Sequence, residues 1–222
     1  MHAVYFEVAP HQDIARLDLE DGLIRQAAAS LTATASTIKE IVVDVPRERT
    51  IDLAGSNDGP SASPAVVIEA EEEGDTAVEL DHLLAEVATV QSAWSAKLST
   101  LIEPSREWAG VVTPGVKLRL SGSAAPGINS ASFEQFVADS LLRCADRCDG
   151  LLALTLAQSI GQASNPPHAV AGFSFVDDQA LDAALVASAF TPFARSELMQ
   201  AASLHIAAVS EHRIAPNPNT WV

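Results

Sequence analysis

The sequence predicts an α+β fold made of two tandem copies of one unit, and two observations support this prediction. Each half of the chain has the pattern strand, helix, strand, strand, helix, strand, starting near residue 2 and again near residue 115. Val4 and Val116 are 112 residues apart, and Ala65 and Val170 are 105 apart, because the loop before Ala65 is longer than its counterpart. A register that is kept on both sides of one loop indicates an internal repeat.

The first copy is expected to cover residues 1–112. Alternating apolar residues and β-branched stretches indicate strands, and the carboxylates around Asp18 and Asp21 mark the start of a helix that reaches about residue 34. Residues 47–63 are a polar loop with Gly, Ser and Pro. Residues 78–98 are predicted to form a second, amphipathic helix. The strands are expected at 3–8, 38–45, 65–71 and 100–103.

The second copy is expected to cover residues 113–222. Asn129 and Ser130 precede a helix with apolar residues on one face, and Asp177 precedes a second helix. This second helix is predicted to continue past Pro192 to residue 200 with a bend, because proline removes a helical hydrogen bond. The strands are expected at 115–120, 151–157, 170–176 and 204–209.

Composition and charge exclude several classes of protein. Of the residues, 48% are hydrophobic and the mean hydropathy is +0.16, yet the chain has no apolar run of the ~20 residues that a membrane helix needs. The N-terminus does not have the pattern of an export signal, so a soluble cytoplasmic protein is expected. The net charge is −16, with 13 basic residues and no basic run, which argues against a nucleic-acid partner.

The two cysteines do not predict a metal site or a disulfide. Cys144 and Cys148 are spaced i and i+4 on an expected helix, without a second ligand pair nearby. Reduced thiols on a partly buried face are therefore expected. The chain shows no phosphate-binding glycine loop, Ser-His-Asp order or spaced metal cluster, so no cofactor and no metal are predicted.

Three stretches of the second half resemble the EthD-like branch of the dimeric α/β-barrel (ferredoxin-like) superfamily. They are the strand, turn and helix start at 116–133, the step from strand to helix at 171–178, and the ending Ser-Glu-His-Arg-Ile at 210–214. The resemblance implies two ferredoxin-like βαββαβ repeats whose antiparallel sheets form a pseudo-dimeric α/β barrel. Members commonly place a histidine midway along the first helix, and this chain has Leu141 there.

The resemblance and the apolar residues together suggest a small apolar ligand. The expected pocket lies between helices and sheet in the second half, with His205 as the candidate catalytic residue. The candidate ligand-binding residues are Phe133, Phe136, Phe173 and Phe175. The resemblance implies a catabolic accessory enzyme of the cofactor-free oxygenase, dehydratase or cyclase type, and leaves open whether the protein is an enzyme. A haem-binding protein and a structural protein without a pocket are the alternatives, and a homodimer is expected.

The inward faces of the first strands carry charged residues. Because side chains alternate along a strand, Lys117 and Arg119 are expected to face the other half of the barrel. We expect one of them to pair with Glu7, Glu69 or Glu71; the alternative is that these side chains are solvated.

Overall fold

The computed structural model describes residues 2–11, 14–33, 38–47, 51, 65–70, 88–103, 112–123, 130–160, 169–191 and 203–214. The elements in chain order are β1 (His2–Pro10), α1 (Arg16–Ala33), β2 (Ile38–Pro46), β3 (Ala65–Ala70), β4 (Ala88–Ile102), β5 (Val112–Ser123), α3 (Ser130–Ala145), β6 (Leu151–Ser159), β7 (Ala169–Phe175), α4 (Asp178–Val186) and β8 (Ser203–Ile214).

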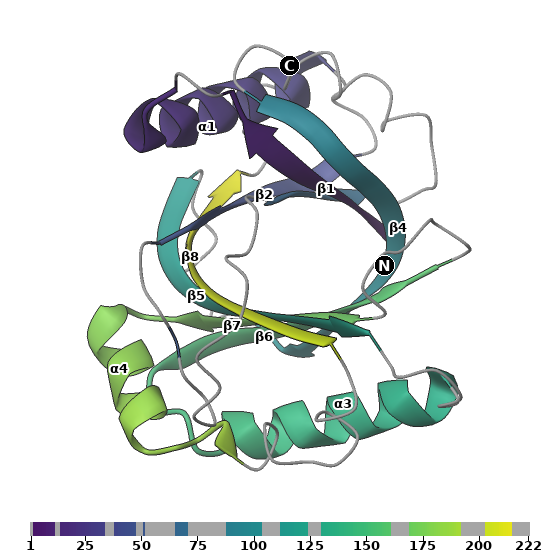
Figure 1. The fold of residues 1–222 in the computed structure, drawn as a ribbon, viewed down its shortest axis with the longest axis vertical. Coiled ribbons are helices and arrows are strands. Elements are labelled where there is room, and N and C mark those ends of the chain that lie inside the picture. The colour runs from purple at the N-terminus through teal and green to yellow at the C-terminus, as the bar shows by residue number, and fades with distance from the viewer. Residues whose placement is uncertain are drawn as a thin grey trace.

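The strands close into one antiparallel barrel in the order β1-β3-β2-β8-β5-β7-β6-β4, seen end-on in Figure 1. The strand order within each half is the same, β4-β1-β3-β2 in the first and β8-β5-β7-β6 in the second. Two seams join the halves, where β2 pairs with β8 and where β4 pairs with β6. The expected α+β class and the barrel are confirmed; descent of the halves from one unit, with a boundary at residue 112, stays a prediction.

The described helices lie outside the barrel. α1 covers the strands of the first half, and α3 and α4 cover those of the second (Figure 1). Under α1, Phe6, Leu23 and Ile41 belong to a buried cluster, and a larger cluster lies under α3 and α4. The alternate side chains of the same strands point into the barrel, because side chains alternate between the faces of a sheet.

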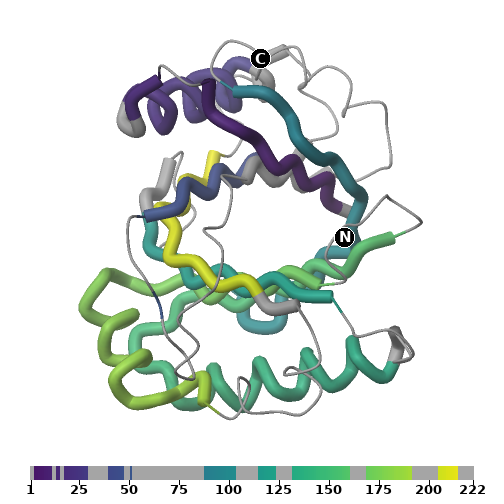
Figure 2. The backbone as a smooth tube through the Cα atoms, in the orientation of Figure 1, coloured from purple at the N-terminus to yellow at the C-terminus, as the bar shows by residue number. Residues whose placement is uncertain are grey.

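β8 is the element that ties the two halves together at the first seam. It pairs along its C-terminal part with β2 and along its whole length with β5. Figure 2 shows this strand in yellow, passing from the lower sheet to the upper one. Residues near the end of β8 therefore contact side chains of both halves.

The helix predicted at 78–98 is wrong from residue 88 onward, where the chain forms β4. Trp94, Ala96 and Leu98 are buried while Ser95 and Lys97 are exposed, so burial alternates with the period of a strand. The separate strand predicted at 100–103 is the end of this long strand. Residues 78–87 lie outside the described residues.

The helix predicted to run from Asp177 to residue 200 ends early within the described residues, and residues 192–200 lie outside them. α4 ends at Val186, and the next residues form a turn in which Ser188 adopts a positive φ of 54°. Asp177 does cap this helix, accepting a hydrogen bond from the backbone N–H of Ala180 at 2.8 Å. None of the described helices is long and apolar enough to cross a membrane.

Candidate functional site in the barrel interior

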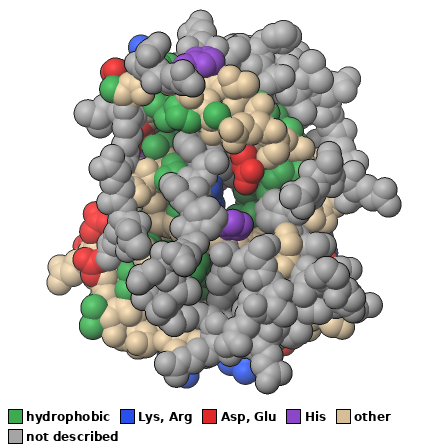
Figure 3. All heavy atoms as spheres, viewed as in Figure 1, with side chains coloured by type: hydrophobic (Ala, Val, Ile, Leu, Met, Phe, Trp, Pro, Cys, Tyr) green, Lys and Arg blue, Asp and Glu red, His purple; other side chains and the backbone are tan. Residues whose placement is uncertain are grey.

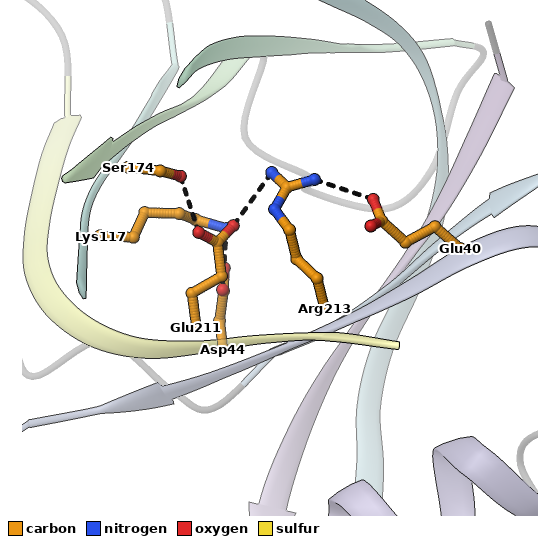
Figure 4. Close-up of polar contacts among 6 residues, drawn as sticks. All are labelled: Glu40, Asp44, Lys117, Ser174, Glu211 and Arg213. Carbon is orange, nitrogen blue, oxygen red and sulfur yellow. Dashed lines mark hydrogen bonds and ion pairs between the residues drawn. The ribbon is translucent and has the colours of Figure 1, made fainter. Parts of the chain in front are cut away.

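Five charged side chains meet inside the barrel, and we call them the charged cluster: Glu40, Asp44, Lys117, Glu211 and Arg213. The Lys117 ammonium lies 2.8 Å from Asp44 Oδ1 and 2.9 Å from Glu211 Oε1. The Arg213 guanidinium also contacts two carboxylates, and lies 3.2 Å from Glu211 Oε1 and 2.8 Å from Glu40 Oε2. These side chains come from β2, β5 and β8, and Figure 4 shows them converging.

The strand register explains why the charged cluster forms. Asp44 of β2 lies opposite Glu211 of β8, and Lys117 of β5 lies opposite Ser174 of β7. These four strands are neighbours, and Ser174 Oγ donates a 2.7 Å hydrogen bond to Glu211 Oε2. The cluster is thus one polar stripe across the first seam, with two acids from the first half and the third acid and both bases from the second.

Burial and charge pairing oppose each other at this site. The side chains of Asp44 and Glu211 are 1% and 0% exposed, and that of Lys117 is 8% exposed. Burial alone would raise the pKa of Glu211, but Lys117 and Arg213 together hold that pKa below its ordinary value. Burial would lower the pKa of Lys117, and Asp44 and Glu211 outweigh it and raise that pKa. Lys117 and Glu211 therefore remain ionised at neutral pH.

Gly172 of β7 makes room for the stem of Lys117. A Cβ at this position would lie 3.0 Å from Lys117 Cε and 3.0 Å from Thr155 Oγ1. The lysine stem has little freedom to move, because both carboxylates hold its ammonium group.

We expect Gly172→Ala to lower the free energy of unfolding by about 1–3 kcal/mol, the usual cost of overpacking. Urea unfolding followed by circular dichroism measures this change. The methionine side chain in Lys117→Met has no charge that fixes its position, so it can move away from an alanine at position 172. In the Lys117→Met background, Gly172→Ala should therefore lower the free energy of unfolding by less. An unchanged unfolding midpoint for the single variant would contradict the close approach.

An apolar wall lies inside the barrel beside the charged cluster. Its buried residues form one cluster, separate from those beneath the helices: Ala3, Tyr5, Val42, Trp94, Ala96, Leu98, Ala157 and Val170. The rings of Tyr5 and Trp94 stack with centroids 4.4 Å apart and planes 11° apart. Figure 3 shows a narrow opening at the centre of the barrel, with acidic, basic, histidine and apolar side chains around it.

The phenylalanines predicted to bind a ligand lie on the other side of the sheet. Phe133 of α3 and Phe173 and Phe175 of β7 are fully buried between the helices and the sheet, and Phe136 packs against their cluster. His205 is half-buried on β8 opposite Ser121, on the strand face that points into the barrel. The structure therefore brings the four phenylalanines together but not His205 with them, and their ligand-binding and catalytic roles stay predictions.

Glu7, one of the three acids expected to pair with Lys117 or Arg119, does not pair with Lys117. Lys117 pairs with Asp44 and Glu211 rather than with Glu7, which accepts a 3.1 Å hydrogen bond from Ser92. Glu71 and the side chain of Glu69 lie outside the described residues, and Arg119 is buried. Glu40 and Asp44 are four residues apart on one face of a strand that is otherwise mostly β-branched. This spacing would have indicated an inward polar face.

The remaining titratable candidates have local roles. Cys144 and Cys148 are free and buried, as expected, and burial raises the pKa of the Cys148 thiol to about 12. Cys148 lies beyond the end of α3 and contacts the Cys144 carbonyl oxygen at 3.3 Å. His212 bonds Glu20 of α1. Among the described residues, no group of three or more His, Cys, Asp or Glu side chains could hold a metal ion.

No family model matches the sequence, and no curated protein matches it. Solved structures do match its fold. A candidate monooxygenase from Fusobacterium nucleatum has a TM-score of 0.58 at 7% identity, covering 95% of this chain and 90% of its own. An anthrone oxidase-like protein has a TM-score of 0.56 at 10% identity, covering 97% and 93%. A chlorite dismutase from Candidatus Nitrospira defluvii has a TM-score of 0.53 at 7% identity, covering 95% and 90%. The chain has the dimeric α/β-barrel fold.

Proposed function

We propose that the protein binds a small, partly aromatic molecule inside the barrel, between the apolar wall and the charged cluster. The observation that carries this proposal is the pairing of an apolar wall with a polar stripe around the central opening (Figure 3). Ligand sites typically combine apolar surface with a few polar groups that fix orientation. The indole N–H of Trp94 is buried without an acceptor among the described residues, so a ligand oxygen at this wall would give it one.

The fold neighbours make a catabolic accessory role the natural setting for such a site. Two of them are named for oxidation reactions: a candidate monooxygenase and an anthrone oxidase-like protein. We propose, on the motifs of the second half, that this chain is an EthD-like member with a cofactor-free reaction or carrier function. The homodimer and the cytoplasmic location remain predictions.

Haem binding is the second candidate, and the described residues of the second half do not fit it. The space between α3, α4 and the sheet is filled by Phe133, Leu141 and Phe173, and no described histidine lies in that cluster. His212 is engaged by Glu20. An absorption spectrum of the purified protein tests this alternative directly.

Adjacent residues of β1 give a matched test of the proposed site. Tyr5 faces the barrel interior and Phe6 faces the cluster under α1. With 4-nitrophenol as probe, Tyr5→Leu should weaken binding roughly two- to tenfold, the value of one aromatic contact. Phe6→Leu should lower stability and leave the dissociation constant unchanged.

Equilibrium dialysis measures both dissociation constants, and native mass spectrometry of the untreated protein identifies any ligand carried through purification. A wild-type protein that does not bind the probe, and carries no ligand, would contradict the proposal. So would equal loss of binding in the two variants.

A further inference from the structure

Glu40 is the most exposed of the three acids of the charged cluster. Its side chain is 21% exposed, compared with 1% for Asp44 and 0% for Glu211. Only its Oε2 atom has a partner among the described residues, the Arg213 guanidinium at 2.8 Å. The second oxygen is therefore free to meet a ligand while Arg213 holds the carboxylate in place.

The position of Glu40 also brings it near the apolar wall. On β2, Glu40 is two residues from Val42, so the two side chains share the inward face. Val42 lies opposite Arg213 in β8, and the Tyr5–Trp94 pair belongs to the same apolar cluster as Val42. A ligand resting on this wall would have its polar end beside Glu40 and Arg213.

The burial of Glu40 favours the uptake of a proton by its carboxylate. Burial, the largest influence, raises the pKa of Glu40, as does Glu211; Arg213 and Lys117 lower it, and the net direction is upward. Asp44 lies on the same face of β2, and Glu69 is the backbone partner of Glu40 on β3. A carboxylate of raised pKa accepts a proton more readily than an ordinary glutamate.

We propose that Glu40 accepts the proton of a weakly acidic hydroxyl ligand, a phenol, bound in the barrel interior. The O–H bond of the ligand breaks, its electron pair stays on the ligand oxygen, and the proton forms a new bond to a Glu40 carboxylate oxygen. Arg213 loses the charge of Glu40 but keeps Glu211, and it then pairs with the phenolate as well, so the number of charges in the interior is conserved. This assignment rests on the proposed function, because it names the ligand class of the same site.

The probe 4-nitrophenol tests the assignment because its ionised form is coloured. At a pH where the free probe is mostly un-ionised, the wild-type protein should bind it with the spectrum of the phenolate. Glu40→Gln keeps an oxygen for Arg213 but cannot take the proton. The ratio of ionised to un-ionised bound probe should then fall roughly tenfold, equivalent to one pKa unit. Glu134→Gln, the same change on α3 outside the barrel, is the matched control and should leave the spectrum unchanged.

Calorimetry of the wild-type protein in buffers of different ionisation enthalpy gives a second measurement that needs no variant. If Glu40 keeps the proton, binding of the phenol releases no proton to the buffer. Release of about one proton per bound phenolate, or an unchanged phenolate spectrum in Glu40→Gln, would overturn the assignment while leaving probe binding intact. A wild-type protein that binds no probe would instead remove the proposed function, and the assignment with it.

Discussion

Replacing Lys117 by Met should lower the free energy of unfolding by about 3–5 kcal/mol, the typical cost of removing one partner from a buried ion pair. The reason is that Asp44 and Glu211 would both remain buried, at 1% and 0% exposure, without the cation they share. Urea unfolding at neutral pH measures the effect. The matched control is Lys97→Met on β4, where the side chain is exposed, and a change within about 0.5 kcal/mol is expected there.

A second variant shows whether this loss of stability comes from the buried carboxylates that no longer have Lys117 as a partner. Asp44→Asn added to Lys117→Met removes the charge of one of the two carboxylates that lose Lys117, and the other, Glu211, keeps Arg213 at 3.2 Å. The double variant should therefore be more stable than Lys117→Met alone. A single variant as stable as the wild type would show that the charged cluster does not hold the seam between β2 and β8.

Phe173→Ala should also cost about 3–5 kcal/mol of stability, as expected for the loss of a buried phenylalanine. Phe173 is fully buried and meets Phe190 edge-to-face, with ring centroids 4.9 Å apart. Thermal and urea unfolding measure the loss, and Val186→Ala, at a position that is 86% exposed, is the control.

The same variant separates the two proposed ligand sites. Phe173 lies beneath the helices, so the folded fraction of Phe173→Ala should bind 4-nitrophenol as the wild type does. A large change in the dissociation constant, measured under conditions where the variant is folded, would favour the space between the helices and the sheet.

The sequence predicted most of the strands and much of the core because these depend on local patterns. The β-branched stretch from Ile38 and the apolar strand at 170–176 matched β2 and β7 to within a few residues. The alternation of Trp94, Ala96 and Leu98 was missed because alanine and leucine also favour helices, and their burial is set by pairing with distant strands.

The charged cluster could not be predicted as a set because its members meet only through the closure of the barrel. Lys117 and Asp44 are brought together by the β2–β8 seam, between strands far apart in the sequence. The inward direction of Lys117 followed from strand alternation, but the choice between Asp44 and Glu7 depended on register. A resemblance carried by short motifs of the second half contained no information about the acids that the first half contributes.

The location of the probe in a crystal of the complex tests the account most directly. We predict electron density for 4-nitrophenol inside the barrel, with its ring on the Tyr5–Trp94 wall and its oxygen beside Glu40 and Arg213. Density among Phe133, Phe136 and Phe175, beneath the helices and outside the barrel, would contradict the account.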